Sequence, residues 1–215
     1  MSYARDFHLV MTHKSSDMTL WDLEVGEPAL MIRTHRGGGA IRTVISVGDT
    51  ADQQRIVSGD RLGTVKIWNS ISFRCEWAHT IHNHSVRQIV SLSPGFMPPL
   101  RPSVSTPEVA TPTTTTTTAT TLVAVMDDTK LTRGLRLAVA FGGHPVVVYL
   151  VDEPDRSAVA LAANSADSSC LAIAGGMLLC ATVKGIMCFS VMSLKFVHML
   201  VGSNVNLTNA MIALP

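Results

Sequence analysis

Short apolar runs alternate with polar turns along most of the chain. The runs are rich in Val, Ile, Leu, Thr and aromatic residues, and clusters of Gly, Asp, Asn and Ser separate them. Helical periodicity does not persist anywhere for more than about two turns, whereas short runs bounded by turn residues are typical of β-strands. The pattern therefore predicts an all-β protein made of many short strands.

The clearest pair of strands lies at residues 55–69, "RIVSGDRLGTVKIWN". An apolar run is followed by a turn that contains glycine and then by a run in which Val65 and Ile67 alternate with polar residues. This layout predicts a β-hairpin. The same layout recurs at 7–23, 136–152 and 177–191.

An aromatic residue stands near the end of each predicted hairpin: Trp21, Trp68, Tyr149 and Phe189. Self-similarity of this kind indicates a repeat architecture. Each hairpin is followed by a third strand and, after a turn, by a further apolar strand. The third strands are "EPALMIRTH", "RCEWAHTIH", "SAVALAAN" and "KFVHMLVGSN", and the further strands are "AIRTVISVG", "VRQIVSLSP", "CLAIAGG" and "NAMIALP". We therefore expect four strands in each repeat.

The spacing between Trp68 and Tyr149 is about twice the other two, and a tract dense in proline and threonine accounts for the excess. Such a tract lacks the apolar surface needed to order itself. We expect residues 94–133 to form a flexible insertion with one extra strand at 122–126. Residues 1–93 then hold two repeats and the first strand of a third, and residues 134–215 hold the rest of the third repeat, the fourth, and the closing strand "VNLTNAMIALP".

Trp21-Asp22, Trp68-Asn69 and the run "SGDRLGTVKIWN" resemble the WD40-repeat family. The resemblance implies a β-propeller, in which each repeat forms a blade of four antiparallel strands. About four blades are expected here. Because family members usually close with more blades, the chain is expected to be an incomplete or half propeller. Its two ends would pair with each other, or another segment or chain would complete the ring.

The resemblance also implies a hydrogen-bonded relay of histidine, serine or threonine, aspartate and tryptophan in each blade. In the second blade His35, Ser58 and Trp68 match by position. The aspartate position falls at Leu62, and Asp60 lies two residues earlier, so we expect a rearranged relay.

His82 occupies the histidine position that precedes the third blade. The other relay positions of that blade carry Val139, Gly143 and Tyr149, so its relay partners are largely missing.

His79, His82 and His84 form a cluster that suggests an alternative function, a metal-binding or hydrolytic protein. His79 and His82 are an odd number of residues apart on a predicted strand, so they should point to opposite faces. No carboxylate stands ready as a partner for a metal ligand or as a general base. We therefore expect no metal, no cofactor and no catalytic residue, and interpret the cluster as a repeat boundary.

Charge and composition point away from several classes of partner. Of the 215 residues 15% are charged, with a formal net charge of +1, which gives no overall attraction to nucleic acid. No apolar run is long enough for a membrane span, and the N-terminus has no apolar signal region. Cys75, Cys170, Cys180 and Cys188 are widely spread and expected to be reduced. These features predict a cytoplasmic protein and leave the nucleus open.

The predicted function is a non-catalytic scaffold that binds one or more proteins within a larger assembly. Loops on a rigid frame are where recognition residues concentrate, and arginine and tryptophan are favoured at protein interfaces. The candidate partner-binding residues are Arg36, Arg42, Arg61, Trp77, His84 and Arg87.

Overall fold

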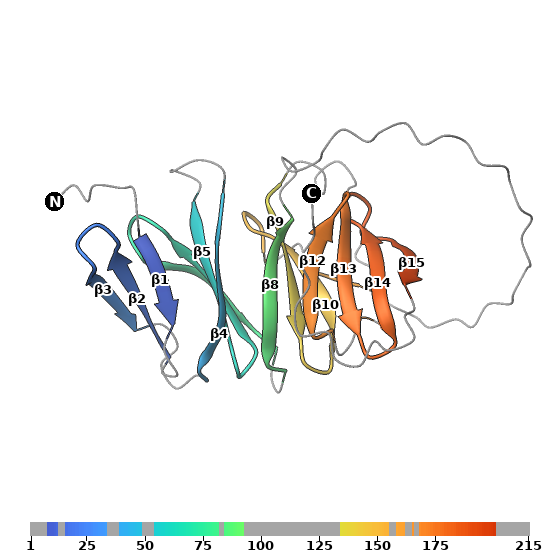
Figure 1. Cartoon of the computed structure of the whole chain (residues 1–215), viewed down its shortest axis with the longest axis horizontal. Helices are drawn as coiled ribbons and strands as arrows, with labels where there is room; N and C mark the ends of the chain where they lie inside the picture. Colours follow the sequence, from blue (N-terminus) through green and yellow to red (C-terminus); the bar gives the residue numbers. More distant parts are fainter. Residues whose placement is uncertain are drawn as a thin grey trace, which may run out of the picture.

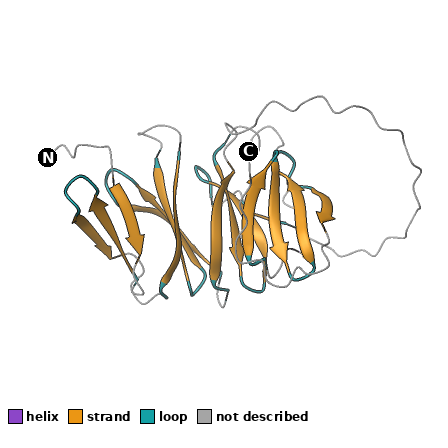
Figure 2. Cartoon of the chain, in the orientation of Figure 1, coloured by secondary structure: helices purple, strands orange, loops and turns teal. Residues whose placement is uncertain are grey.

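The computed structural model describes residues 8–12, 16–33, 39–48, 54–81, 84–92, 134–154, 158–161, 165 and 168–200. These ranges contain no α-helix, and the prediction of an all-β protein is confirmed (Figure 2). The predicted insertion at 94–133, its extra strand at 122–126 and the closing strand "VNLTNAMIALP" lie outside the described residues.

The strands form four antiparallel sheets, each built from strands in the order of the chain (Figure 1). Sheet A has three strands and sheets B, C and D have four each. Sheet A contains β1 (His8–Thr12), β2 (Asp17–Asp22) and β3 (Glu27–Arg33), and sheet B contains β4 (Ile41–Val47), β5 (Arg55–Asp60), β6 (Thr64–Asn69) and β7 (Cys75–Thr80). Sheet C contains β8 (Val86–Leu92), β9 (Arg136–Phe141), β10 (His144–Leu150) and β11 (Val159–Ala160), and sheet D contains β12 (Cys170–Ala174), β13 (Met177–Thr182), β14 (Gly185–Ser190) and β15 (Phe196–Leu200).

The four predicted hairpins correspond to β1–β2, β5–β6, β9–β10 and β13–β14. Within its described residues, the predicted strand "SAVALAAN" is shorter than expected: Val159 and Ala160 form the register with β10, and the Leu161 N–H donates to the Val146 carbonyl. Alanine has low β-propensity, and a strand rich in it offers little side chain to pack on a neighbour.

The sheets pack face to face in the order A, B, C, D, and each junction has its own apolar core. Met18 of sheet A packs with Ile41, Ile56 and Trp68 of sheet B. A second core lies between sheets B and C, and a third between sheets C and D. Sheets A and D therefore lie at opposite ends of the long axis of the molecule (Figure 1).

The same strand position supplies the aromatic residue at each junction. Trp68, Tyr149 and Phe189 each lie on the sheet face that packs against the preceding sheet, in the three separate cores. Their cross-strand neighbours in the register are Ile56, Leu137 and Leu178. We call this the leading face of a sheet, and we call the opposite face, which packs on the following sheet, the trailing face.

Two glycines in the run "SGDRLG" permit close approach of neighbouring segments. A Cβ on Gly59 would lie 2.5 Å from Val86 Cγ1, so the bare backbone lets sheet C approach sheet B. Gly63 has a φ of +87°, and a Cβ there would lie 2.2 Å from the Ile81 carbonyl oxygen. Only glycine meets both requirements at position 63.

Truncation of Ile67 tests the core between sheets B and C. Ile67 is 2% exposed within that core, and Ile67→Ala should lower the free energy of unfolding by about 2–5 kcal/mol through lost burial and a residual cavity. Urea denaturation measures the change. Ile71→Ala is the matched control, because Ile71 is 67% exposed in a turn, and equal losses for the two variants would contradict the assignment.

Candidate functional site

Two arginines occupy equivalent β-bulges at the starts of neighbouring strands. In sheet B the register between β4 and β5 shifts between Ile41 and Thr43, which leaves Arg42 as the extra residue. In sheet C the register between β8 and β9 shifts between Val86 and Gln88, which leaves Arg87 as the extra residue. A bulge redirects a side chain, and both arginines are exposed.

The turn between β5 and β6 places Arg61 beside these strands. The Arg61 backbone N–H donates to the Ala40 carbonyl at 3.0 Å, which fixes the turn against the start of β4. Asp60 is fully buried, and its Oδ1 accepts hydrogen bonds from the backbone N–H groups of Leu62 at 2.9 Å and Thr64 at 2.8 Å. This carboxylate thus stabilises the turn from within, and Arg61 is left exposed.

His84 connects the turn of sheet B to the turn of sheet C. Its backbone N–H donates to the Ile81 carbonyl, and the Ile81 N–H donates to the Gly63 carbonyl. Its ring Nδ1 lies 2.9 Å from the Gly142 carbonyl oxygen. Because a carbonyl can only accept, Nδ1 carries the hydrogen in this contact.

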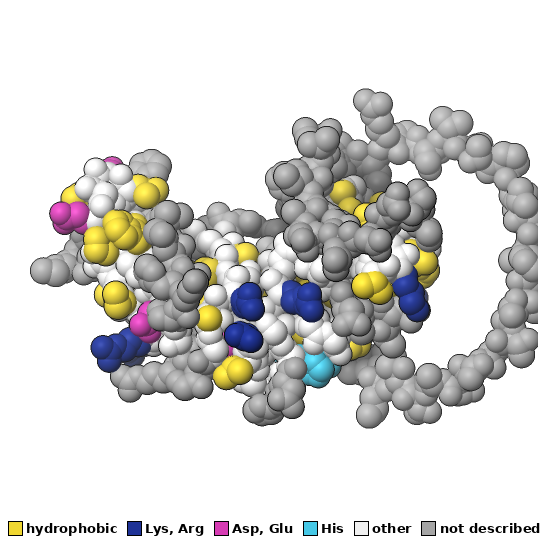
Figure 3. Space-filling model, turned by 60° about the horizontal axis from the view of Figure 1, so that its bottom comes forward, with side chains coloured by type: hydrophobic (Ala, Val, Ile, Leu, Met, Phe, Trp, Pro, Cys, Tyr) yellow, Lys and Arg dark blue, Asp and Glu magenta, His cyan; other side chains and the backbone are white. Residues whose placement is uncertain are grey.

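Arg87 lies against the same turn of sheet C. A Cβ on Gly142 would be 3.1 Å from Arg87 Nε and 3.3 Å from Nη2, so the guanidinium group extends over this glycine. We call Arg42, Arg61, His84 and Arg87 the basic turn face. Figure 3 shows Lys and Arg side chains gathered near the middle of the molecule, with a histidine nearby.

Acidic residues concentrate at the opposite ends of the strands. Asp22, Glu24 and Glu27 surround the turn between β2 and β3, and Asp152 and Glu153 follow β10. On the basic turn face of sheets B and C, the described acidic residue is the buried Asp60. Among the described residues, exposed acidic side chains therefore lie at the strand ends opposite the basic turn face, together with Arg55 and Arg74.

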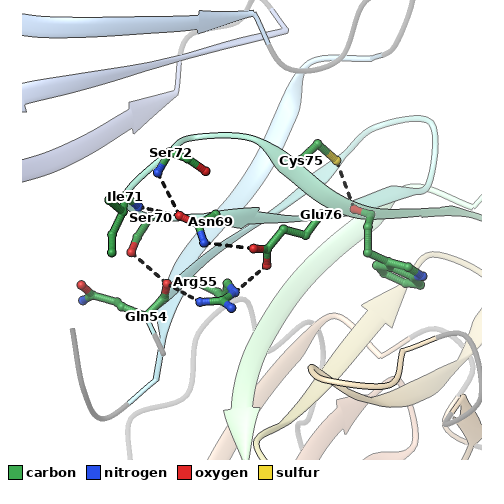
Figure 4. Close-up of polar contacts among 9 residues, drawn as sticks. Gln54, Arg55, Asn69, Ser70, Ile71, Ser72, Cys75 and Glu76 are labelled. Carbon is green, nitrogen blue, oxygen red and sulfur yellow. Dashed lines mark hydrogen bonds and ion pairs between the residues drawn. The ribbon is translucent and has the colours of Figure 1, made fainter. Parts of the chain in front are cut away.

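At the strand ends of sheet B that lie away from the basic turn face, Glu76 forms an ion pair with Arg55 and accepts a hydrogen bond from Asn69 Nδ2 at 3.0 Å (Figure 4). Asn69 Oδ1 also accepts from the backbone N–H groups of Ile71 at 3.0 Å and Ser72 at 2.9 Å. Asp22 Oδ1 accepts in the same way from Glu24 and Val25 in sheet A. The polar residues that follow Trp21 and Trp68 are thus used to stabilise turns.

Part of the expected relay is present within sheet B. Trp68 Nε1 donates to Ser58 Oγ at 2.9 Å, and both residues are buried. Asp60 bonds to the turn backbone as described above. His35 and His82 lie outside the described residues.

Sheet C has no equivalent of this hydrogen bond. Val139, which cannot accept one, stands where Ser58 stands in sheet B, and the buried Tyr149 hydroxyl has no hydrogen-bond partner among the described residues. Burial raises the pKa of the Tyr149 phenol to about 12. Trp77 and His79 of β7 lie over this ring, with centroid separations of 5.4 Å and 6.0 Å.

Trp77, a candidate partner-binding residue, is therefore partly buried against the core between sheets B and C and lies away from the basic turn face. His79 stacks on Trp77 at 5.7 Å, whereas His84 bonds to Gly142. Within the ranges that the structure describes, His, Cys, Asp and Glu form no group of three suited to a metal ion. Arg36 lies outside those ranges.

Sequence reasoning missed two basic residues. Lys184 is exposed in the turn between β13 and β14, which corresponds to the turn that carries Arg61. Its position in the repeat is a signal that could have identified it. Arg136 is fully buried, and its Nη1 donates to the Val191 carbonyl at 2.6 Å; burial lowers the pKa of this guanidinium group. No local pattern distinguishes it from a surface arginine.

The four cysteines are free thiols, and Cys170, Cys180 and Cys188 are buried. Burial raises the pKa of the Cys180 thiol to about 12. At neutral pH this thiol is protonated and therefore a poor nucleophile. No helix in the described part of the chain is long and apolar enough to cross a membrane.

Comparison with protein-family models and with curated proteins finds no match for this chain. Among solved structures the chain is similar to a computationally designed protein, Ika8, with a TM-score of 0.59 and 14% sequence identity. The match covers 99% of this chain and 50% of that chain, so this chain spans about half the length of the structure it matches. At this identity the likeness shows the fold alone.

Removing the Ser58 hydroxyl should destabilise the protein. Ser58→Ala leaves the buried Trp68 N–H without its acceptor, at a cost of about 1–3 kcal/mol in the free energy of unfolding. Trp68→Phe and the double variant complete a thermodynamic cycle, measured by urea denaturation. The Ser58→Ala penalty should shrink once Trp68 is phenylalanine, and an unchanged penalty would show that the hydrogen bond is not its cause.

Removing the Tyr149 hydroxyl should not lower the free energy of unfolding, in contrast to removing the Ser58 hydroxyl. Tyr149→Phe deletes a buried group that has no described partner, so the free energy of unfolding should stay the same or rise by about 1 kcal/mol. A clear loss of stability would contradict this account.

The pH dependence of stability provides a second test of Tyr149. The native phenol keeps its proton up to a pKa of about 12, whereas the unfolded chain releases it near the ordinary tyrosine pKa of 10.0. The stability associated with this proton is therefore fully present below pH 10 and is lost as the pH rises toward 12. Tyr149→Phe should lose less stability over this range, and equal pH profiles would contradict the assignment.

Proposed function

We propose that the chain is a non-catalytic scaffold of the WD40-like propeller type that binds an acidic segment of a partner protein on the basic turn face. The observation that carries this proposal is the pair of equivalent bulges at Arg42 and Arg87. A bulge interrupts the ladder, and its recurrence at the same position in two sheets directs two guanidinium groups outward.

The supporting environment is rigid. The turns beside Arg61 and His84 are tied by backbone hydrogen bonds to the starts of β4 and β8. Arg42, Arg61 and Arg87 are exposed. Each has a planar guanidinium group whose N–H donors suit a carboxylate. The backbone hydrogen bonds fix where the turns lie, so no loop has to be ordered on binding, which favours recognition.

An acidic protein segment fits this face better than nucleic acid does. The chain has a formal net charge of +1, and acidic side chains cluster on the opposite face, where they would repel an extended polyanion. A short acidic segment can contact the arginines and avoid that repulsion. The proposed setting is the cytoplasm, with the nucleus as an open alternative.

Binding of a fluorescein-labelled oligoglutamate peptide, followed by anisotropy, tests the proposal. Arg42→Ala/Arg87→Ala should weaken binding about tenfold, which corresponds to about 1.4 kcal/mol, and added salt should weaken the parent chain as well. The matched control is Arg74→Ala, because Arg74 is exposed beside the opposite face.

Two outcomes would contradict the proposal. One is a loss of affinity that is as large for Arg74→Ala as for the double variant. The other is tighter binding of oligothymidylate than of oligoglutamate at the same ionic strength, which would indicate a nucleic-acid partner.

A further inference from the structure

The two end faces of the array are of complementary kinds. Each internal junction joins the trailing face of one sheet to the leading face of the next, which carries Trp68, Tyr149 or Phe189. The leading face of sheet A and the trailing face of sheet D have no described sheet packed on them. Within the described part of the chain, one face of each kind is therefore without a sheet packed on it.

Sheet A bears an aromatic residue at the position that the later sheets use for packing. Trp21 pairs in the register with Leu9, as Trp68 pairs with Ile56. Trp21 is an odd number of residues from Met18, which packs on sheet B, so it lies on the leading face. Its Nε1 is buried without a hydrogen-bond partner among the described residues.

The trailing face of sheet D has the small and aliphatic character of the other trailing faces. Leu179 and Cys188 pair across β13 and β14 on the face opposite Phe189, as Ala138 and Val148 do in sheet C. Ala138 and Val148 lie in the core between sheets C and D. The trailing face of sheet D is therefore a packing surface of a kind that already receives an aromatic leading face within this chain.

Exposed apolar side chains accumulate at the same two ends. Ten of the twelve large hydrophobic side chains exposed within the described residues belong to sheets A and D, and sheet C has none of the twelve. Met31 is 63% exposed and pairs with Thr19 on the leading face of sheet A. Leu200 is 50% exposed and pairs with Ile186 on the trailing face of sheet D. Met31 and Leu200 therefore add exposed apolar surface to the two faces, and exposed apolar patches mark interaction sites.

We propose that a second copy of this chain covers both ends. The leading face of sheet A in each copy packs on the trailing face of sheet D in the other, which gives two identical junctions related by a twofold axis. A head-to-tail contact closes into a ring when its rotation permits. The solved structure that the chain matches is similar over 99% of this chain and 50% of its own. The other half of that longer chain corresponds in length to a second copy of this one. The inference deepens the proposed scaffold and rests on its propeller-like geometry.

Sedimentation equilibrium of the full chain tests this pairing. The expected mass is twice the chain mass of 23.0 kDa. Met31→Glu and Leu200→Glu should each weaken self-association at least tenfold, because each places a charge in both junctions. Ile71→Glu, also at an exposed apolar position but in a turn of sheet B, is the control and should leave the mass unchanged. Circular dichroism establishes that each variant keeps its β structure.

Mixing the variants distinguishes a head-to-tail contact from a symmetric one. A pair made of one Met31→Glu chain and one Leu200→Glu chain has one intact junction, so the mixture should associate more strongly than either variant alone. A contact between two copies of sheet A would instead leave Leu200→Glu fully dimeric, which would overturn the inference. A monomeric parent chain, or a series of masses beyond two copies, would also overturn it.

Failure of the pairing can be distinguished from failure of the proposed function. A monomeric chain that still binds oligoglutamate through Arg42 and Arg87 would remove the pairing and leave the scaffold in place. A dimer that does not bind oligoglutamate would do the reverse.

Discussion

Face-to-face packing of consecutive sheets is the constraint on which the rest of the structure depends. Sheets B, C and D each place an aromatic ring at the same register position against the sheet before them, at Trp68, Tyr149 and Phe189. Large rings contribute much of the buried apolar area at such junctions. Because the ring occupies the same register position each time, the sheets repeat with similar geometry, and their turns lie at matching places.

The basic turn face follows from this repetition. Arg42 and Arg87 are brought to corresponding places because β4 and β8 carry the same bulge at the same point in consecutive sheets. The buried Asp60 holds its turn from within, so the neighbouring Arg61 is left for the surface. The polar residues at the other strand ends, such as Asn69, serve the turns themselves.

The relay illustrates how the repeat tolerates loss of a polar interaction. Trp68 bonds to Ser58, but the corresponding Tyr149 faces Val139 and has no described partner. Shape and apolar burial are therefore retained where the hydrogen bond is lost. An unpaired buried hydroxyl costs free energy, and the tilted aromatic contact between Trp77 and Tyr149 offsets part of that cost.

The strands and their pairing could be predicted from the sequence because alternation and turn residues are local signals. The hairpin at 55–69 is an example, since its glycines and Asp60 determine the turn. The bulges at Arg42 and Arg87 could not be predicted in this way, because a bulge depends on the register with a partner strand. The same holds for Trp77, whose partner Tyr149 is distant in sequence, and for Arg136, whose burial depends on sheet D.

Native-state hydrogen exchange tests the central claim, that sheet-on-sheet packing along an open array holds this protein together. Sheets B and C are packed on both faces, whereas sheets A and D have one described neighbour each. At low protein concentration, where copies are separate, amides of β9 and β10 should be the best protected, and those of β2 and β3 should exchange much faster. Equal protection of all four sheets, or stronger protection of sheet A than of sheet C, would contradict the account.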